Sequence, residues 1–88
     1  MAQEVRVRTI FEDAGHSWLK VSKAELVELG IQSEISPFSY QKGGDAFLEE
    51  DCDLGVYMDA LKARGIELSF ERVYHVESPV RSFHDYCV

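Results

Sequence analysis

The residues best able to take part in binding or catalysis form one acidic run, Glu49-Glu50-Asp51-Cys52-Asp53. Carboxylates at this density can bind a divalent cation, favour the start of a helix, or contact Lys and Arg of a partner. The spacing does not match a calcium-binding loop, which needs acids at alternate positions, a glycine and a distal glutamate. We therefore predict no metal site and no other cofactor.

The acidity of the whole chain is concentrated around this run. The chain has 88 residues and a formal net charge of −7, and no Lys or Arg lies between Lys42 and Lys62. That window carries −6, while the rest of the chain holds ten acids against nine bases. A helix start needs one or two carboxylates, so we predict that the others act in binding. The acids of the window are Asp45, Glu49, Glu50, Asp51, Asp53 and Asp59.

This charge pattern disfavours binding to nucleic acid, which needs clustered Lys and Arg to neutralise phosphates. It favours contact with a basic protein surface, including one that normally holds nucleic acid. Duplex DNA carries one negative charge per about 1.7 Å of its axis, so several carboxylates on one exposed face would make a DNA mimic. Tyr57 lies in the same segment, and tyrosine is enriched among interface anchors. The predicted partner-binding residues are Asp45, Glu49, Glu50, Asp51, Asp53, Tyr57 and Asp59.

No motif in the chain indicates catalysis. It lacks a nucleophile elbow, a phosphate-binding loop and a metalloprotease helix, and its three histidines are His16, His75 and His84. The carboxylates around Cys52 are expected to raise the pKa of its thiol, which disfavours a nucleophile. Cys52 and Cys87 are expected to be free thiols. We predict no catalytic residues and a protein that is not an enzyme.

Two hairpins and two helices must position the acidic run. The first strand, residues 4–11, alternates apolar and charged side chains, which predicts Val5 and Val7 inward and Arg6 and Arg8 outward. A glycine-containing turn leads into a second strand with the same period. These two strands are expected to pair as a hairpin.

Helix signals follow each hairpin. Ser22 with Glu25 three residues later forms a capping box, and Gly30 supplies a left-handed stop. A second hairpin then leads to a second helix, which Asp51 or Asp53 is expected to cap.

These patterns predict a single compact α+β domain over residues 1–88, with residues 80–88 as a short tail. The predicted order is β-β-α-β-β-α-β, with the strands in one antiparallel sheet and two helices. The apolar runs are too short to cross a membrane and no signal-peptide pattern opens the chain. A cytoplasmic location is therefore expected.

Four strings of the sequence are familiar when taken together: His16-Ser17-Trp18-Leu19-Lys20-Val21, Glu25-Leu26-Val27-Glu28-Leu29-Gly30-Ile31, Ile35-Ser36-Pro37-Phe38-Ser39-Tyr40 and Phe47-Leu48-Glu49-Glu50-Asp51-Cys52-Asp53. They resemble small uncharacterised proteins carried by bacterial phages and plasmids. The resemblance covers residues 5–85 and brings no established catalytic residues. In size, charge and context the chain is similar to anti-CRISPR proteins, which are often short and acidic and block the nucleic-acid surfaces of CRISPR effectors. This resemblance implies an inhibitor acting in the cytoplasm of a bacterial host.

A structural or assembly module is the alternative class of function. The last predicted strand, residues 66–76, could pair with a second copy or with another protein if it lies at a sheet edge. Residues 20–31 also resemble the helix-opening segment of swapped-hairpin transcriptional regulators. Those proteins bind DNA through basic arms, and the net charge of −7 opposes that mode of binding here. The oligomeric state, including a homodimer, stays open.

Overall fold

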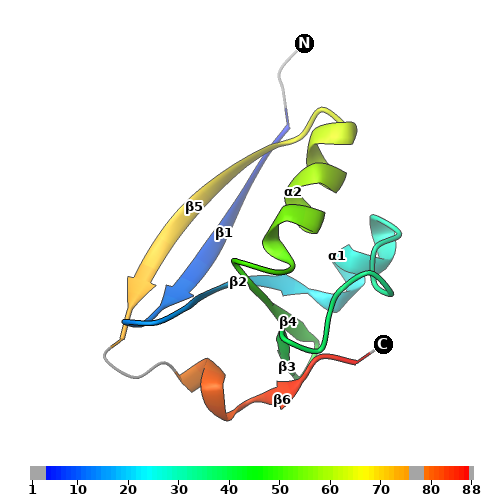
Figure 1. Ribbon diagram of the computed structural model, residues 1–88. Coiled ribbons are helices and arrows are strands. Elements are labelled where there is room, and N and C mark those ends of the chain that lie inside the picture. The colour runs from blue at the N-terminus through cyan, green and yellow to red at the C-terminus, as the bar shows by residue number, and fades with distance from the viewer. Residues whose placement is uncertain (1–3, 76–78, 88) are drawn as a thin grey trace.

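A computed structural model describes residues 4–75 and 79–87. Two α-helices, α1 (Lys23–Glu28) and α2 (Leu54–Ala63), and one short 3-10 helix, η1 (Pro79–Ser82), accompany six strands. The strands are β1 (Val5–Glu12), β2 (Ser17–Ser22), β3 (Tyr40–Lys42), β4 (Asp45–Glu49), β5 (Glu67–Tyr74) and β6 (His84–Asp85). They form one sheet in the order β5-β1-β2-β4-β3-β6, and Figure 1 shows both α-helices on the same side of it.

The predicted α+β class with two helices is confirmed, but the predicted all-antiparallel sheet is wrong. Strand β5 runs parallel to β1, from the pair Val5↔Glu67 to the pair Glu12↔Tyr74. The reason is the path of α2, which crosses from β4 over the sheet and returns the chain beside the start of β1. Gly65, with φ of +70°, makes the turn that this crossover needs.

The end of the chain contributes to the sheet, which sequence patterns did not predict. The predicted order matches the first seven elements, and η1 and β6 follow them. Strand β6 pairs with β3, and the backbone N–H of the buried Tyr86 donates to the Ser39 carbonyl at 2.8 Å. A two-residue strand carries no alternation, so periodicity could not reveal it.

The predicted orientation of β1 is also wrong. Val5 and Val7 are 50% and 52% exposed, while Arg6 and Arg8 point to the helix side and bond to Glu25 of α1. Ile10 shares their face of the strand and is buried. The pattern reversed because a buried carboxylate on α1 makes charged side chains favourable on the inner face.

Each face of the sheet carries its own apolar cluster. The larger cluster lies under the helices and includes Leu19, Leu48 and Leu61. The smaller cluster lies on the opposite face, where Trp18, Phe47 and Val80 pack together. Trp18 and Leu19 separate in this way because successive side chains of a strand point to opposite faces. Among the described residues, no helix combines the length and apolar character needed to span a membrane.

Candidate functional site

Two loops distant in sequence meet at one corner of the sheet. Strand β2 lies between β1 and β4, so the β1–β2 turn is next to the end of β4. Trp18 is the cross-strand partner of Glu49, and the backbone N–H of Glu50 donates to the Ser17 carbonyl at 3.0 Å. The acidic run therefore begins directly beside the hairpin turn.

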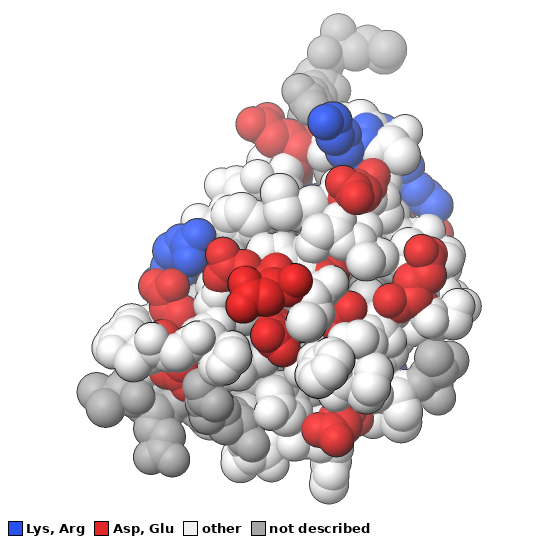
Figure 2. Space-filling model, viewed as in Figure 1, with Lys and Arg blue, Asp and Glu red and all other residues white. Residues whose placement is uncertain are grey.

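Five carboxylates and one imidazole surround a cavity of about 290 Å³ at this corner. Figure 2 shows a group of acidic side chains over the connection between β4 and α2, with the visible Lys and Arg toward the edges of this face. We call the five acids that line the cavity the acidic surface. They are Glu12, Asp13, Glu49, Glu50 and Asp51, and His16 lies beside them. Sequence patterns missed Glu12 and Asp13, because only the pairing of β2 with β4 brings the turn to the acidic run.

Few bases neutralise the acidic surface. Arg72 Nη1 lies 3.2 Å from Glu12 Oε2, but among the described residues no Lys or Arg pairs with Glu49, Glu50 or Asp51. His16 Nδ1 lies 3.6 Å from Glu49 Oε1, and Glu50 accepts a hydrogen bond from the Ser17 hydroxyl. Glu49, Glu50 and Asp51 thus leave a local excess of negative charge that a basic partner would compensate.

Of the six acids in the predicted partner-binding set, three line one cavity. Glu49, Glu50 and Asp51 converge at the acidic surface. Asp45 lies at the other end of β4, about 13 Å from Glu49 at the usual rise of a strand, and is 3.8 Å from Lys20 Nζ. Asp59 is exposed on α2 and does not line that cavity.

Asp53 is buried, and it acts inside the protein. Only 2% of its surface is exposed, so the prediction that it contacts a partner is wrong. Its carboxylate accepts from the Ser36 N–H at 3.0 Å, from the Ser36 hydroxyl at 2.7 Å and from the Ser39 hydroxyl. Asp53 is the N-cap residue of α2 by position, but its side chain makes no capping bond there. It fixes the turn over residues 36–39.

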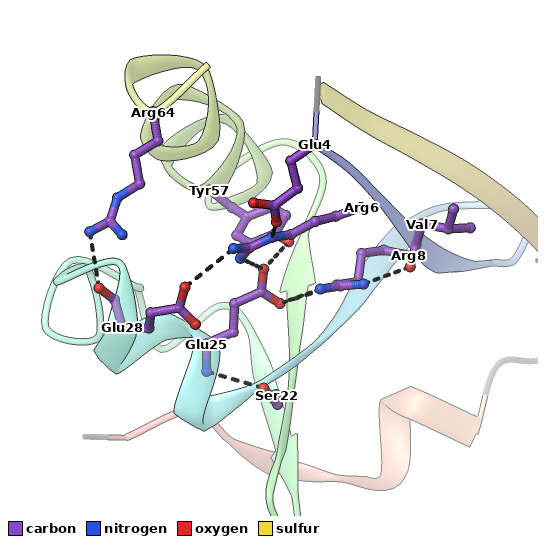
Figure 3. Close-up of polar contacts among 9 residues, drawn as sticks. All are labelled: Glu4, Arg6, Val7, Arg8, Ser22, Glu25, Glu28, Tyr57 and Arg64. Atoms are coloured by element: carbon purple, nitrogen blue, oxygen red, sulfur yellow. Dashed lines mark hydrogen bonds and ion pairs between the residues drawn. The ribbon is translucent and has the colours of Figure 1, made fainter. Parts of the chain in front are cut away.

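Tyr57 is also buried, so the prediction of an exposed tyrosine contact is wrong. It is 0% exposed, and its hydroxyl donates to Glu25 Oε2 at 2.6 Å. Figure 3 shows Arg6 and Arg8 of β1 reaching the same carboxylate, at 2.7 Å and 3.0 Å. We call Arg6, Arg8, Glu25 and Tyr57 the buried ion network. It joins β1, α1 and α2.

The buried ion network changes the acidity of its members. Burial raises the pKa of Glu25, but the hydrogen bonds from Tyr57 and Arg6 and the charge of Arg8 outweigh it and hold this pKa below 4.5. Burial and the hydrogen bond to Glu25 raise the pKa of Tyr57. Glu25 therefore stays ionised in the folded protein, while Tyr57 keeps its proton.

The predicted capping box is confirmed in part. Ser22 Oγ accepts from the Glu25 N–H at 3.1 Å, as expected for an N-cap. The Glu25 side chain completes the buried ion network with Arg6 and Tyr57, so it serves tertiary structure. The sequence shows the spacing of a capping box, but it does not show that Arg6 and Tyr57 compete for the Glu25 carboxylate.

A second cavity of about 400 Å³ adjoins the acidic surface and shares His16 and Glu49 with it. Its walls come mainly from strands on the face opposite the helices. We call it the aromatic cavity. It is lined by Trp18, Phe38 and Tyr40, and by His16, Glu49 and Asp85.

The sites for metal or thiol chemistry are limited. Within the described residues, His16, Glu49 and Asp51 offer ligand atoms within 4.8 Å of one another, which is the set suited to a divalent ion. Cys52 and Cys87 are free and exposed, as predicted. Desolvation and the charges of Glu49 and its neighbours raise the pKa of Cys52, so its thiol is a weak nucleophile.

Comparison with known proteins gives no match: no family model, no curated protein and no solved structure is significantly similar to the chain.

Proposed function

We propose that this protein is a non-enzymatic binding protein whose acidic surface docks on a Lys/Arg-rich protein surface. The partner surface is one that normally holds nucleic acid, so the protein acts as a DNA mimic and an inhibitor. The observation that carries the proposal is the convergence of five carboxylates from two loops around one cavity. Carboxylates at this density attract a basic surface and release the counterions that nucleic acid would release.

A CRISPR effector complex in a bacterial cytoplasm is the first target to test. The support for this partner is the resemblance of the chain to small phage and plasmid proteins, together with its length of 88 residues and its net charge of −7. Effector complexes hold nucleic acid in positively charged channels, which is the kind of surface that clustered carboxylates complement.

Displacement of duplex DNA from a purified CRISPR effector complex tests the proposal. The full chain should compete with DNA, and its affinity should fall as NaCl rises. Charge reversal at three positions, Glu49→Lys, Glu50→Lys and Asp51→Lys, should weaken competition about a hundredfold, if each reversal costs about 1 kcal/mol.

A matched control separates a local surface from net charge. The variant with Glu34→Lys, Asp59→Lys and Glu67→Lys makes the same change in charge at exposed positions outside the acidic surface. It should compete almost as well as the natural chain. Equal losses in the two variants would contradict a localised site, and unchanged competition by the first variant would contradict the proposal itself.

A second candidate function is self-assembly or pairing with another protein through β5. This strand is at the edge of the sheet, as that function requires. The backbone N–H groups of Glu67 and His75 point to β1, where they donate to the carbonyls of Glu4 and Glu12. By the alternation of a strand, Leu68, Phe70, Arg72 and Tyr74 then direct their N–H groups outward. That row is a template for a further strand.

Sedimentation at increasing protein concentration tests this second function. Self-assembly predicts a rise in mass that Arg72→Pro abolishes and Arg72→Ala keeps, because proline removes an outward N–H without touching the bonds to β1. A single mass across all concentrations would contradict self-assembly and leave the acidic surface as the function to pursue.

A further inference from the structure

We propose that the aromatic cavity receives one arginine side chain of the partner protein. This inference rests on the proposed function and gives it an anchor, because it names the residue that the partner inserts. The cavity of about 400 Å³ combines aromatic walls with two carboxylates, and among the described residues that line it none is Lys or Arg. Aromatic faces and carboxylates together select a planar cation.

The carboxylates and the aromatic rings are paired across the strands. Trp18 lies opposite Glu49 in the β2–β4 ladder, and Tyr40 lies opposite Asp85 in the β3–β6 ladder. Directly opposed residues of antiparallel strands share a face, so both pairs open to the same side of the sheet. A guanidinium entering here would stack on a ring and donate hydrogen bonds to carboxylates on two sides, which suits its planar fork of donors.

Phe38 completes the cavity from outside the sheet. It is 67% exposed, the most exposed of the large apolar side chains in the described residues. Covering an exposed aromatic ring at the rim of a cavity removes apolar surface from water, which is favourable. Phe38 therefore offers a bound partner an apolar contact that does not depend on charge.

The buried Asp53 keeps this ring in place. Its three hydrogen bonds go to Ser36 and Ser39, on either side of Phe38, and the Phe38 N–H donates to Ser36 Oγ at 3.3 Å. The turn over residues 36–39 is thus fixed before a ligand arrives. A preformed wall lowers the entropic cost of binding. Asp53 is a positioning residue for the cavity.

A set of short peptides tests the proposal on the full chain. The probes are acetyl-Gly-Arg-Gly-amide, the same peptide with lysine, and the same peptide with citrulline, a neutral group of the same shape as arginine. Trp18 is the only tryptophan of the chain and lines the cavity, so its fluorescence reports occupancy. The arginine peptide should bind about tenfold tighter than the citrulline peptide and about threefold tighter than the lysine peptide.

Two variants locate the binding. Glu49→Gln should weaken the arginine peptide about tenfold, and Phe38→Ala about threefold. Glu50→Gln is the matched control, since it removes the same charge from the neighbouring residue, which does not line the aromatic cavity. It should change affinity less than twofold. Amide NMR spectra of all three variants should keep the dispersion of the natural chain, which verifies folding.

Two results would overturn the inference. They are equal binding of the arginine and citrulline peptides, and equal losses of affinity in Glu49→Gln and Glu50→Gln. The second result would leave diffuse attraction to the acidic surface, so the proposed function would survive. Arginine binding in the cavity, with DNA displacement unaffected by charge reversal, would instead retain the cavity and overturn the proposed function.

Discussion

The buried ion network and the acidic surface both contain carboxylates, but the carboxylate of the network is paired inside the protein and those of the surface face a cavity. Glu25 is 6% exposed, and three side chains bond to its carboxylate. The carboxylates of the acidic surface lie around an open cavity, and among the described residues no Lys or Arg pairs with Glu49, Glu50 or Asp51. An acid that is buried must have partners, whereas exposed acids can remain uncompensated at a low cost in water.

The difference separates acids that stabilise the fold from acids that are available to a ligand. In this chain the sequence run from Glu49 to Asp53 contains both kinds, because Asp53 is buried and bonds to Ser36 and Ser39 while Glu50 and Asp51 are exposed. Proximity in the sequence therefore does not define the site. Removing acids of the first kind should lower the free energy of unfolding, and removing acids of the second kind should raise it.

Glu25→Ala should give the largest loss. It leaves Arg6 and Arg8 without the carboxylate that they share, in a region where Tyr57 is fully buried. Removing one partner of a buried ion pair costs about 3–5 kcal/mol, and the lower end applies here because Arg8 is 29% exposed. Urea unfolding monitored by circular dichroism measures the change.

Glu28→Ala is the matched control for Glu25→Ala. Glu28 belongs to the same helix and also pairs with Arg6, at 3.2 Å, but its side chain is 56% exposed. A surface ion pair contributes about 0–1 kcal/mol, so this variant should be nearly as stable as the natural chain. Similar losses in both variants would mean that burial of the network contributes nothing.

Asp53→Ala should give the next largest loss of stability. It removes the acceptor of the Ser36 N–H, the Ser36 hydroxyl and the Ser39 hydroxyl, and each orphaned buried group costs about 1–3 kcal/mol. We expect a total of about 2 kcal/mol, since the turn over residues 36–39 can relax toward water. A change below about 0.5 kcal/mol would contradict the structural role of Asp53.

The pH dependence of stability gives a third, smaller contrast. The pKa of Glu25 is lowered in the folded protein, so the unfolded chain takes up its proton first as the pH falls. The contribution of Glu25 is therefore complete at pH values well above the pKa of an unfolded glutamate, and it is lost as the pH falls through the folded pKa. Urea midpoints at pH 7, 5, 4 and 3 should fall less steeply in Glu25→Gln than in the natural chain, and equal slopes would contradict the role of the network.

Local signals in the sequence predicted the helix start at Ser22 and the left-handed end at Gly30, because caps and glycine stops depend on neighbouring residues. Such local signals could not predict contacts between side chains that are far apart in the sequence. Arg6 and Arg8 look like outward residues of a strand until Glu25 is placed over them.

The candidate site shows the same division. The run from Glu49 to Asp51 was predicted to act in binding, and the structure places these acids together. Glu12 and Asp13 lie beside these acids only because β2 pairs with β4. Asp53 lies apart from them because its carboxylate accepts hydrogen bonds from Ser36 and Ser39 inside the protein. Partners this far apart in the chain have no signature in one sequence.

The smallest effect should have the opposite sign. Asp51→Asn together with Glu49→Gln removes two like charges from a surface where carboxylates repel one another, and the Asp51 side chain makes no hydrogen bond or ion pair among the described residues. We expect stability to rise by about 0.5 kcal/mol in low salt. The gain should vanish in 0.5 M NaCl, because the Debye screening length is about 10 Å at 0.1 M salt and becomes shorter as the salt concentration rises. A loss of stability at both salt concentrations would mean that these acids support the fold, and it would remove the main distinction between the two regions.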